Sequence, residues 1–524
     1  MSKRRAVMLC ILFSFACMVG GCGGFGRAVY SAVRVENVSI EMPRTNAQPA
    51  RIVFDIAWDT SFRDDLNRDA VWVFAKFREA AQPWRHARMA TVPSAHRIGR
   101  NNGVLATLAP SSDGLGLFLY RAEDGFTSID WDQVSLAWDL SAGGVDRSAT
   151  VEVEVIALEM VYVPEGPFWL GDGTNVDALL AAQFERGTGG QPFEVNSEAA
   201  ITLGGGGDDS LGNHDRRVPS SIPQQYWDDF SDSTRQTLPL EFPKGFAGFY
   251  AMKHELTQGD YARFLNLLDA SQQGSRNPVV EVPGGEEHRY AISAAPPFRA
   301  TPYNRAAHWL SWMDLAAFAD WSGLRPMTEL EFEKAARGDR IPDAGEFAWG
   351  PESPPAGKYN LQDANTPDEL VVNQRTGANV AFDGTVGLAS SIAGPLRVAA
   401  FAPLAISRLG AGGSYYRITE MSGNLAEMVV TVGRSTGRRY RGGHGDGELS
   451  PAGNAGGAEV EFWPGARRVA RGGYEVLDAD GSGIRGGDWT AEARSLRVSD
   501  REQINKPADR RDMRWGGRLA RSSQ

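Results

Sequence analysis

The first folded part of the chain alternates apolar and polar positions with a period of two. Ile52, Phe54, Ile56 and Trp58 are separated by more polar or smaller residues. The same pattern recurs in residues 71–77, 115–119, 134–140 and 151–155. Such alternation predicts half-buried strands, and about seven of them in one span are typical of an antiparallel sandwich. The sequence therefore predicts an N-terminal all-β sandwich over residues 33–158.

After Met160 the pattern predicts short helices separated by loops. Three hydroxyl residues are each followed, three positions on, by an acid: Thr257 by Asp260, Ser311 by Asp314, and Thr328 by Glu331. This spacing is that of the capping box at a helix start. Glycine and proline punctuate residues 201–222, 350–413 and 433–488, and the chain has 60 glycines, which indicates many tight turns. We therefore predict one large, loop-rich α+β domain over residues 159–524.

The N-terminal residues resemble an export signal. Lys3, Arg4 and Arg5 precede an apolar stretch, which ends in small residues at Cys22. About 15 apolar residues are short for a membrane span, which needs roughly 20. The pattern predicts a lipoprotein signal peptide over residues 1–21, with a lipid on Cys22 and a tether over residues 22–32. An ordinary signal peptide or an uncleaved anchor are the alternatives.

A lipid on Cys22 would place the protein in the bacterial cell envelope, attached to the membrane by its N-terminus. Gly23 follows the cysteine where an aspartate would signal retention in the inner membrane, so the sequence favours the outer membrane. The net charge of −11 argues against a nucleic-acid partner. All three cysteines lie at or before position 22, so the rest of the chain forms no disulfide and has no thiol nucleophile.

The run from Trp321 to Gly338 resembles the signature of the sulfatase-modifying-factor family, the formylglycine-generating enzyme domain. Other segments resemble the family in the same order along the chain: residues 160–166, 255–257, 421–427, 485–489 and 516–518. The resemblance implies a variant of the C-type-lectin-like fold, with little regular structure and often with bound calcium.

Two departures separate this chain from the family's enzymes. The oxidase members hold copper with two cysteines shortly after the strand that Arg485 to Trp489 resembles, whereas residues 490–498 contain no cysteine. Soft thiolate selects Cu(I), so copper is not supported. A distant branch uses iron held by histidines, and the seven histidines here contain no close pair, so iron is not supported either. The sequence favours a binding or scaffold role over catalysis. The alternative is an oxidoreductase acting on an exported peptide or small molecule.

The resemblance also implies a calcium site at the glycine–asparagine turn. Its expected ligands are Glu420, Gly423, Leu425 and Glu427. Hard cations accept such mixed shells of carbonyl and carboxylate oxygens. The alternative is that Asn424 and Glu427 only satisfy backbone amides of the turn.

A ligand pocket is expected where the family has its catalytic cleft. Its predicted residues are Asp488, Trp489, Arg494 and Arg497. An envelope protein, a peptide or a glycan is the expected partner, and the sequence does not distinguish among them.

Overall fold

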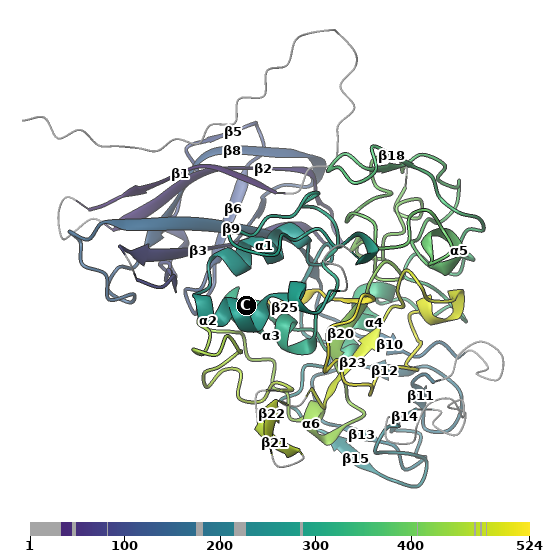
Figure 1. Ribbon diagram of the computed structural model, residues 1–524. Coiled ribbons are helices and arrows are strands. Elements are labelled where there is room, and N and C mark those ends of the chain that lie inside the picture. Colours follow the sequence, from purple (N-terminus) through teal and green to yellow (C-terminus); the bar gives the residue numbers. More distant parts are fainter. Residues whose placement is uncertain are drawn as a thin grey trace, which may run out of the picture.

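The computed structural model describes residues 33–43, 49–80, 82–173, 182–213, 227–282, 287–405, 407–465, 468–471, 474–477 and 479–523 (Figure 1). The predicted signal peptide, the tether and Cys22 lie outside these residues. Within them, no helix is both long enough and apolar enough to cross a membrane.

The N-terminal strands form two antiparallel arrays. The strands are β1 (Arg34–Glu41), β2 (Ala50–Arg63), β3 (Asp69–Glu79), β4 (Arg85–His86), β5 (Arg100–Asn101), β6 (Ala106–Pro110), β7 (Leu117–Arg121), β8 (Gly125–Trp138) and β9 (Val151–Val163). A four-stranded sheet has the order β1-β2-β8-β5. An eight-stranded sheet has the order β17-β25-β16-β9-β3-β7-β6, with β4 paired to β3, and includes β16 (Phe249–Met252), β17 (Arg325–Pro326) and β25 (Leu519–Ser522). In Figure 1 the smaller sheet lies above the larger one at the upper left.

An apolar core fills the space between the two sheets. Phe54 and Trp58 of β2, Val73 of β3, and Trp131 and Leu136 of β8 are all buried in it. The Trp58 and Trp131 rings meet edge to face with centroids 5.2 Å apart, a favourable aromatic geometry. The expected alternation is confirmed in β2, where apolar positions are buried and the residues between them are half-buried.

The larger sheet is buried on both faces. Val73 and Ala75 of β3 face the smaller sheet, while Trp72 and Phe74 belong to a second core on the other side. Phe74 meets Trp321 edge to face at 5.3 Å. The expectation of one wetter face per strand is therefore wrong for β3, because a third layer covers that face.

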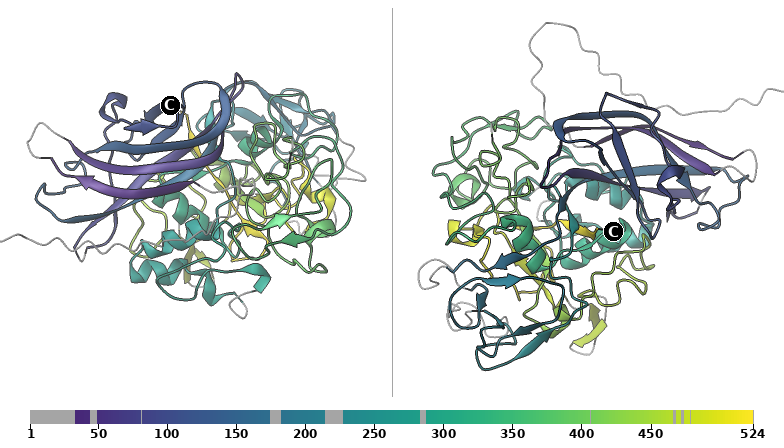
Figure 2. Two further views of the ribbon diagram at one scale, coloured as in Figure 1. Left: turned by 90° about the horizontal axis from the view of Figure 1, so that it is seen from above. Right: turned by 180° about the vertical axis from the view of Figure 1, so that it is seen from behind.

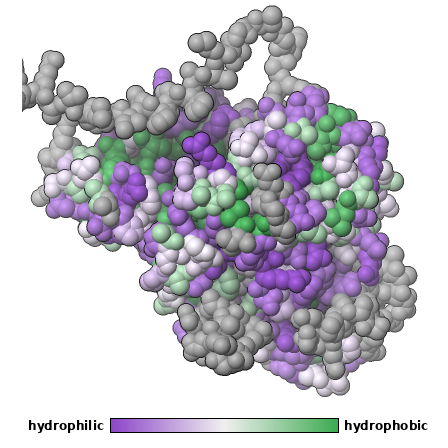
Figure 3. All heavy atoms as spheres, viewed as in Figure 1, coloured by the Kyte–Doolittle hydropathy of each residue, from purple (hydrophilic) through white to green (hydrophobic). Residues whose placement is uncertain are grey.

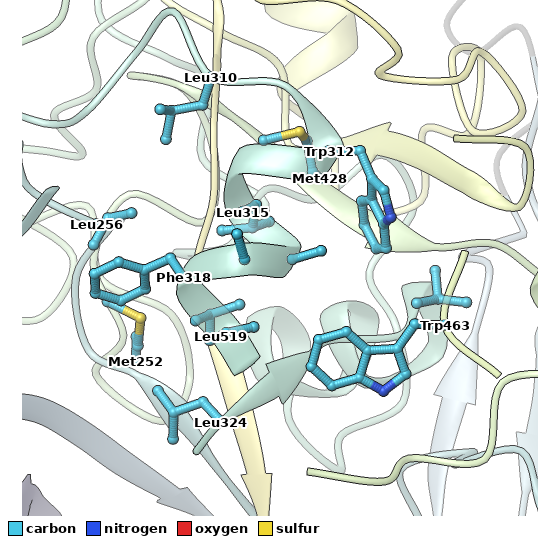
Figure 4. Close-up of a cluster of buried hydrophobic side chains, with 14 of the residues drawn as sticks. Met252, Leu256, Leu310, Trp312, Leu315, Phe318, Leu324, Met428, Trp463 and Leu519 are labelled. Carbon is cyan, nitrogen blue, oxygen red and sulfur yellow. The ribbon is translucent and has the colours of Figure 1, made fainter. Parts of the chain in front are cut away.

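Helices provide this third layer. They are α1 (Gln258–Asn266), α2 (Ala270–Arg276) and α3 (Trp312–Trp321). Leu315 and Phe318 of α3 pack among Leu256, Leu519 and Met252 (Figure 4). The views from above and from behind show the same packing of the N-terminal strands against the rest of the chain (Figure 2).

One sheet joins the N-terminal strands to the rest of the chain. Strand β9 pairs with β3 from Val151 to Val161 and with β16 from Met160 to Val163. The domain boundary expected at residue 158 falls inside β9, and the sheet continues on both sides of it.

The predicted helix starts are confirmed. Thr257, Ser311 and Thr328 are the N-caps of α1, α3 and α4 (Glu329–Arg337), and each side chain accepts a hydrogen bond from the backbone three residues on. Gly323, just beyond α3, and Gly338, at the end of α4, have φ of 68° and 84°, the left-handed region that glycine adopts without strain.

The remaining strands and α-helices are short and lie in loop-rich chain. They are β10 (Phe168–Leu170), β11 (Glu185–Arg186), β12 (Phe193–Val195), β13 (Ile201–Leu203), β14 (Leu211–Gly212), β15 (Gln236–Leu238), β18 (Leu361–Gln362), β19 (Leu370–Val371), α5 (Asp383–Val386), β20 (Ala426–Val430), α6 (Ser435–Arg438), β21 (Arg468–Arg471), β22 (Tyr474–Leu477), β23 (Ser482–Arg485) and β24 (Trp515–Gly516). The structure is thus rich in strands and has few helices, and its second part is loop-rich with short helices, as the sequence predicted.

The surface in Figure 3 shows hydrophobic residues at the upper left, where the two N-terminal sheets lie. Val35 and Val153 pack against the core between these sheets but are only partly buried. The core between the sheets is therefore not fully covered at its edge.

Substituting Phe74 tests the coupling of the layers. Phe74→Ala should lower the free energy of unfolding by about 3–5 kcal/mol, because it leaves a cavity between β3 and Trp321. Since β3 also contributes side chains to the core between the sheets, the unfolding transitions followed by circular dichroism and by tryptophan fluorescence of the full chain should shift together. Val38→Ala, at a position 39% exposed, is the control and should change the value by less than about 0.5 kcal/mol. Two transitions, of which only one moves, would contradict the coupling.

Candidate functional site

Buried ion pairs join helix α4 to strand β23. Arg485 donates to Glu329 Oε2 at 3.1 Å and to Glu333 Oε1 at 2.7 Å, and all three side chains are fully buried. Arg337 donates to the other oxygen of Glu333 at 2.9 Å. Burial alone would raise the pKa of Glu333, but the two guanidinium groups hold it below its ordinary value. Buried charges need partners of opposite charge, so these ion pairs fix the position of the C-terminal end of β23 against α4.

Asn424 fastens the glycine–asparagine turn to the end of the larger sheet. Its amide donates to Glu255 Oε2 at 2.5 Å, and its carbonyl accepts from the backbone of Leu396 at 2.8 Å. The other oxygen of Glu255 accepts from the backbone of Leu425 at 2.8 Å. Asn424 itself has a φ of 65°, which asparagine tolerates better than most residues. Its side chain therefore has a structural role in this turn.

The two acids of the expected calcium site have different surroundings. Glu420 Oε1 accepts from the backbone of Ala399 at 2.9 Å, and its other oxygen accepts from the Thr419 hydroxyl. Glu427 Oε1 accepts from Arg518 Nη2 at 2.8 Å. Glu427 Oε2 is buried and has no hydrogen-bond partner among the described residues. Burial raises the pKa of Glu427 to about 7. Glu427 thus has one oxygen that no described residue contacts by a hydrogen bond, whereas Glu420 has protein donors at both oxygens.

These features meet around strand β20, which pairs with β23 on one side and with β24 on the other. Residues 231–523, more than half of the chain, match the family model of the sulfatase-modifying factor enzyme 1-like domain. The chain belongs to this family. The expected resemblance is thereby confirmed, and the family's domain has the C-type-lectin-like fold. The comparison with curated proteins finds no match.

Two of the four residues expected to form the family-type ligand pocket are enclosed by the protein. Trp489 is fully buried, donates to the carbonyl of Met513 at 3.1 Å and packs 5.2 Å from the His288 ring. Asp488 accepts from the backbone and the hydroxyl of Thr490 at 2.7 and 2.6 Å. Burial raises the pKa of Asp488 above its ordinary value.

The two arginines of the expected pocket point to other partners. Arg494 is 44% exposed and lies 3.3 Å from Glu502. Arg497 donates to the carbonyl of Gly345 and packs over the Phe347 ring. The structure therefore does not bring Asp488, Trp489, Arg494 and Arg497 together on one cavity wall.

A small cavity does lie beside Asp488. It has a volume of about 30 Å³, and Ala491, Ser495, Asp500 and Arg514 also line it. This volume is far below the roughly 300 Å³ or more that is typical of small-molecule sites. Burial raises the pKa of Asp500 to about 6.

A larger cavity lies where the N-terminal sheets meet the family domain. We call it the junction cavity; its volume is about 330 Å³. Thr60 and Phe62 of β2 and Phe126 of β8 line one side, and residues between Ala399 and Thr419 line the other. Lys253 and His254, directly after β16, line it from the larger sheet. In Figure 1 the ends of β2 and β8 reach the green loops at this place.

A buried polar cluster supports the junction cavity from within. Lys253 Nζ lies 2.9 Å from Glu159 Oε2 and 3.4 Å from Asp69 Oδ2. His254 Nδ1 lies 2.8 Å from the Thr419 hydroxyl. Burial alone would raise the pKa of Glu159, but the Lys253 ammonium lowers it to about 2. The cluster thus keeps Glu159 ionised and fixes the side chains of Lys253 and His254.

Sequence reasoning missed the junction cavity. Its residues come from segments far apart in the chain, and none of these segments has a recognisable motif. The adjacent pair Lys253–His254, just before the expected helix start at Thr257, is the one local signal. That signal indicates polar residues beside a predicted helix, but it does not predict which other segments those residues contact.

Proposed function

We propose that this protein is an exported, lipid-anchored binding or scaffold protein of the bacterial cell envelope. The observation that carries the proposal is the absence of cysteine from residues 23–524 of a chain that belongs to the sulfatase-modifying-factor family. The oxidase members of the family need a cysteine pair, which binds copper and engages the substrate thiol. Without thiolates neither step has a ligand or a nucleophile.

The junction cavity supports the binding role. Its volume lies in the range of small-molecule sites, and it is larger than the cavity beside Asp488. We further propose that the N-terminal strands act as a sandwich that completes this site. A partner protein, a peptide or a glycan of the envelope remains our proposal for what the scaffold holds.

The chemistry is tested with a sulfatase-type Cys-x-Pro-x-Arg peptide. The purified full chain should leave the peptide unchanged in the presence of copper and oxygen, because it has no thiolate pair after the signal segment. Mass spectrometry would detect loss of the thiol and gain of an aldehyde. A cysteine-containing oxidase of the same family is the positive control. Conversion of the peptide by this chain would refute the non-catalytic assignment.

We propose that calcium binds at the glycine–asparagine turn. Glu427 Oε2, which is buried without a partner among the described residues, supports this, with the carbonyls of Gly423 and Leu425 as further ligands. Both oxygens of Glu420 already accept protein hydrogen bonds, so we expect Glu420 to contribute less than the sequence suggested.

Thermal unfolding of the full chain tests the calcium proposal. Calcium should raise the unfolding midpoint by a few degrees over the value in EGTA, because a ligand that binds only the folded state stabilises it. Glu427→Gln should abolish this rise. Glu152→Gln, at a side chain 61% exposed on β9, is the control and should keep it. An equal rise in wild type and Glu427→Gln would contradict the site.

The lipid anchor is tested by metabolic labelling with a fatty acid. Cys22→Ser should lose the label and leave the membrane fraction, because the thiol of Cys22 is the proposed attachment atom. Cys17→Ser, within the proposed signal peptide, is the matched control and should keep the label. A labelled, membrane-bound Cys22→Ser protein would refute the anchor.

A further inference from the structure

The junction cavity combines an apolar wall with a cationic rim. Ala399, Ala402, Ala405 and Ala411 line one side, and Phe62 and Phe126 line the other. Phe62 and Phe126 are direct partners in the pairing of β2 with β8. Phe62 is 3% exposed, whereas Phe126 is 64% exposed at the edge of the cavity. An aromatic side chain this exposed beside an alanine-lined hollow offers contact area to an apolar ligand.

The charged side chains at the cavity all have the same sign. Lys253, Arg408 and Arg417 line it, and no aspartate or glutamate does so among the described residues. This is notable in a chain whose net charge is −11. Because apolar walls lower the local dielectric constant, cations at such a rim attract an anion more strongly than they would in open water.

Arg408 is the cation best placed to meet a ligand. Its guanidinium donates to the carbonyl of Gly413 at 2.8 Å, and no described carboxylate lies within ion-pair distance of it. Burial and the guanidinium groups of Arg340 and Arg417 lower the pKa of Arg408 from its ordinary value. An anion that entered the cavity would relieve this repulsion among arginines.

Arg417 supplies a second, more exposed cation. It lies over the Phe62 ring at 4.9 Å and pairs with Asp64 at 3.3 Å. Both members of this pair are more than a third exposed, so the pair is weak and Arg417 can turn toward a ligand at little cost. Lys253 is different, since Glu159 and Asp69 already hold its ammonium.

We propose that the junction cavity binds a small amphiphilic anion, with its apolar body against the alanine and phenylalanine walls and its anionic group at Arg408 and Arg417. The inference rests on the binding role proposed above and names the ligand class. It is independent of the lipid anchor and of the missing oxidase chemistry, so those two tests can succeed while this one fails.

Three ligands with one ring system test the proposal on the full chain in neutral detergent. They are naphthoate, naphthylmethanol and naphthylmethylammonium, which carry an anionic, a neutral and a cationic group. Calorimetry, corrected by titration into detergent alone, should show naphthoate binding roughly tenfold tighter than the alcohol, the ratio that one charge-assisted hydrogen bond produces. The ammonium ligand should bind weakest. Comparing the affinities for octanoate and octanol tests whether an acyl chain can replace the ring.

Variants locate the binding. Arg408→Gln should lower the affinity for naphthoate roughly tenfold and leave the affinity for the alcohol unchanged. Arg417→Gln, at a more exposed position, provides the same test if Arg408→Gln fails to fold. Ala402→Trp should fill the cavity and remove binding of both ligands. Arg299→Gln and Ala142→Trp, at exposed positions outside the cavity, are the controls and should bind as wild type does. Equal affinity for all three ligands, or unchanged naphthoate binding by Ala402→Trp, would overturn the proposal.

Discussion

Strand β9 pairs with β3 along one edge and with β16 along the other. This pairing determines the positions of the buried polar residues at the end of β16. The backbone of Lys253, just after β16, donates to the carbonyl of Glu159 in β9, which brings Lys253 Nζ to the Glu159 carboxylate. Glu255, two residues further, reaches Asn424 and fastens the glycine–asparagine turn. Consecutive residues after one strand thus hold the junction cavity on one side and the family turn on the other.

The charged side chains at the end of β16 and on the neighbouring strands are buried, so their positions are strongly constrained. Glu159, Lys253 and Asp69 lie in the protein interior, where an ion without a partner would cost several kcal/mol. Burial raises the pKa of Asp69, although the Lys253 ammonium opposes that effect. Removing Lys253 would leave the carboxyl groups of Glu159 and Asp69 without their shared cation. The arrangement can therefore persist only if the N-terminal sheets and the family domain stay packed together, which agrees with the continuous sheet.

Local features of this fold could be predicted from the sequence, and features that depend on distant packing could not. The alternation from Ile52 to Trp58 and the cap at Thr328 are encoded within a few residues, so both were found. Phe74 is buried on its second face only because Trp321 covers it, and no local pattern encodes that contact. The family motifs identified the domain, but a motif does not fix exposure. Trp489 belongs to one such motif, yet its ring is buried and its indole N–H is already satisfied by Met513.

The part of the chain that matches the family has a buried polar framework without any cysteine. Arg485 pairs with Glu329 and Glu333, and Asn424 donates to Glu255, so these contacts hold the fold without thiol chemistry. The cavity beside Asp488 has a volume of about 30 Å³, whereas the junction cavity has a volume of about 330 Å³. Thr60, Phe62 and Phe126 lie outside the residues that match the family. A site that needs these residues exists only where the N-terminal strands pack on the domain. The ligand that it selects is therefore a property of this combination of parts and cannot be inferred from the family domain alone.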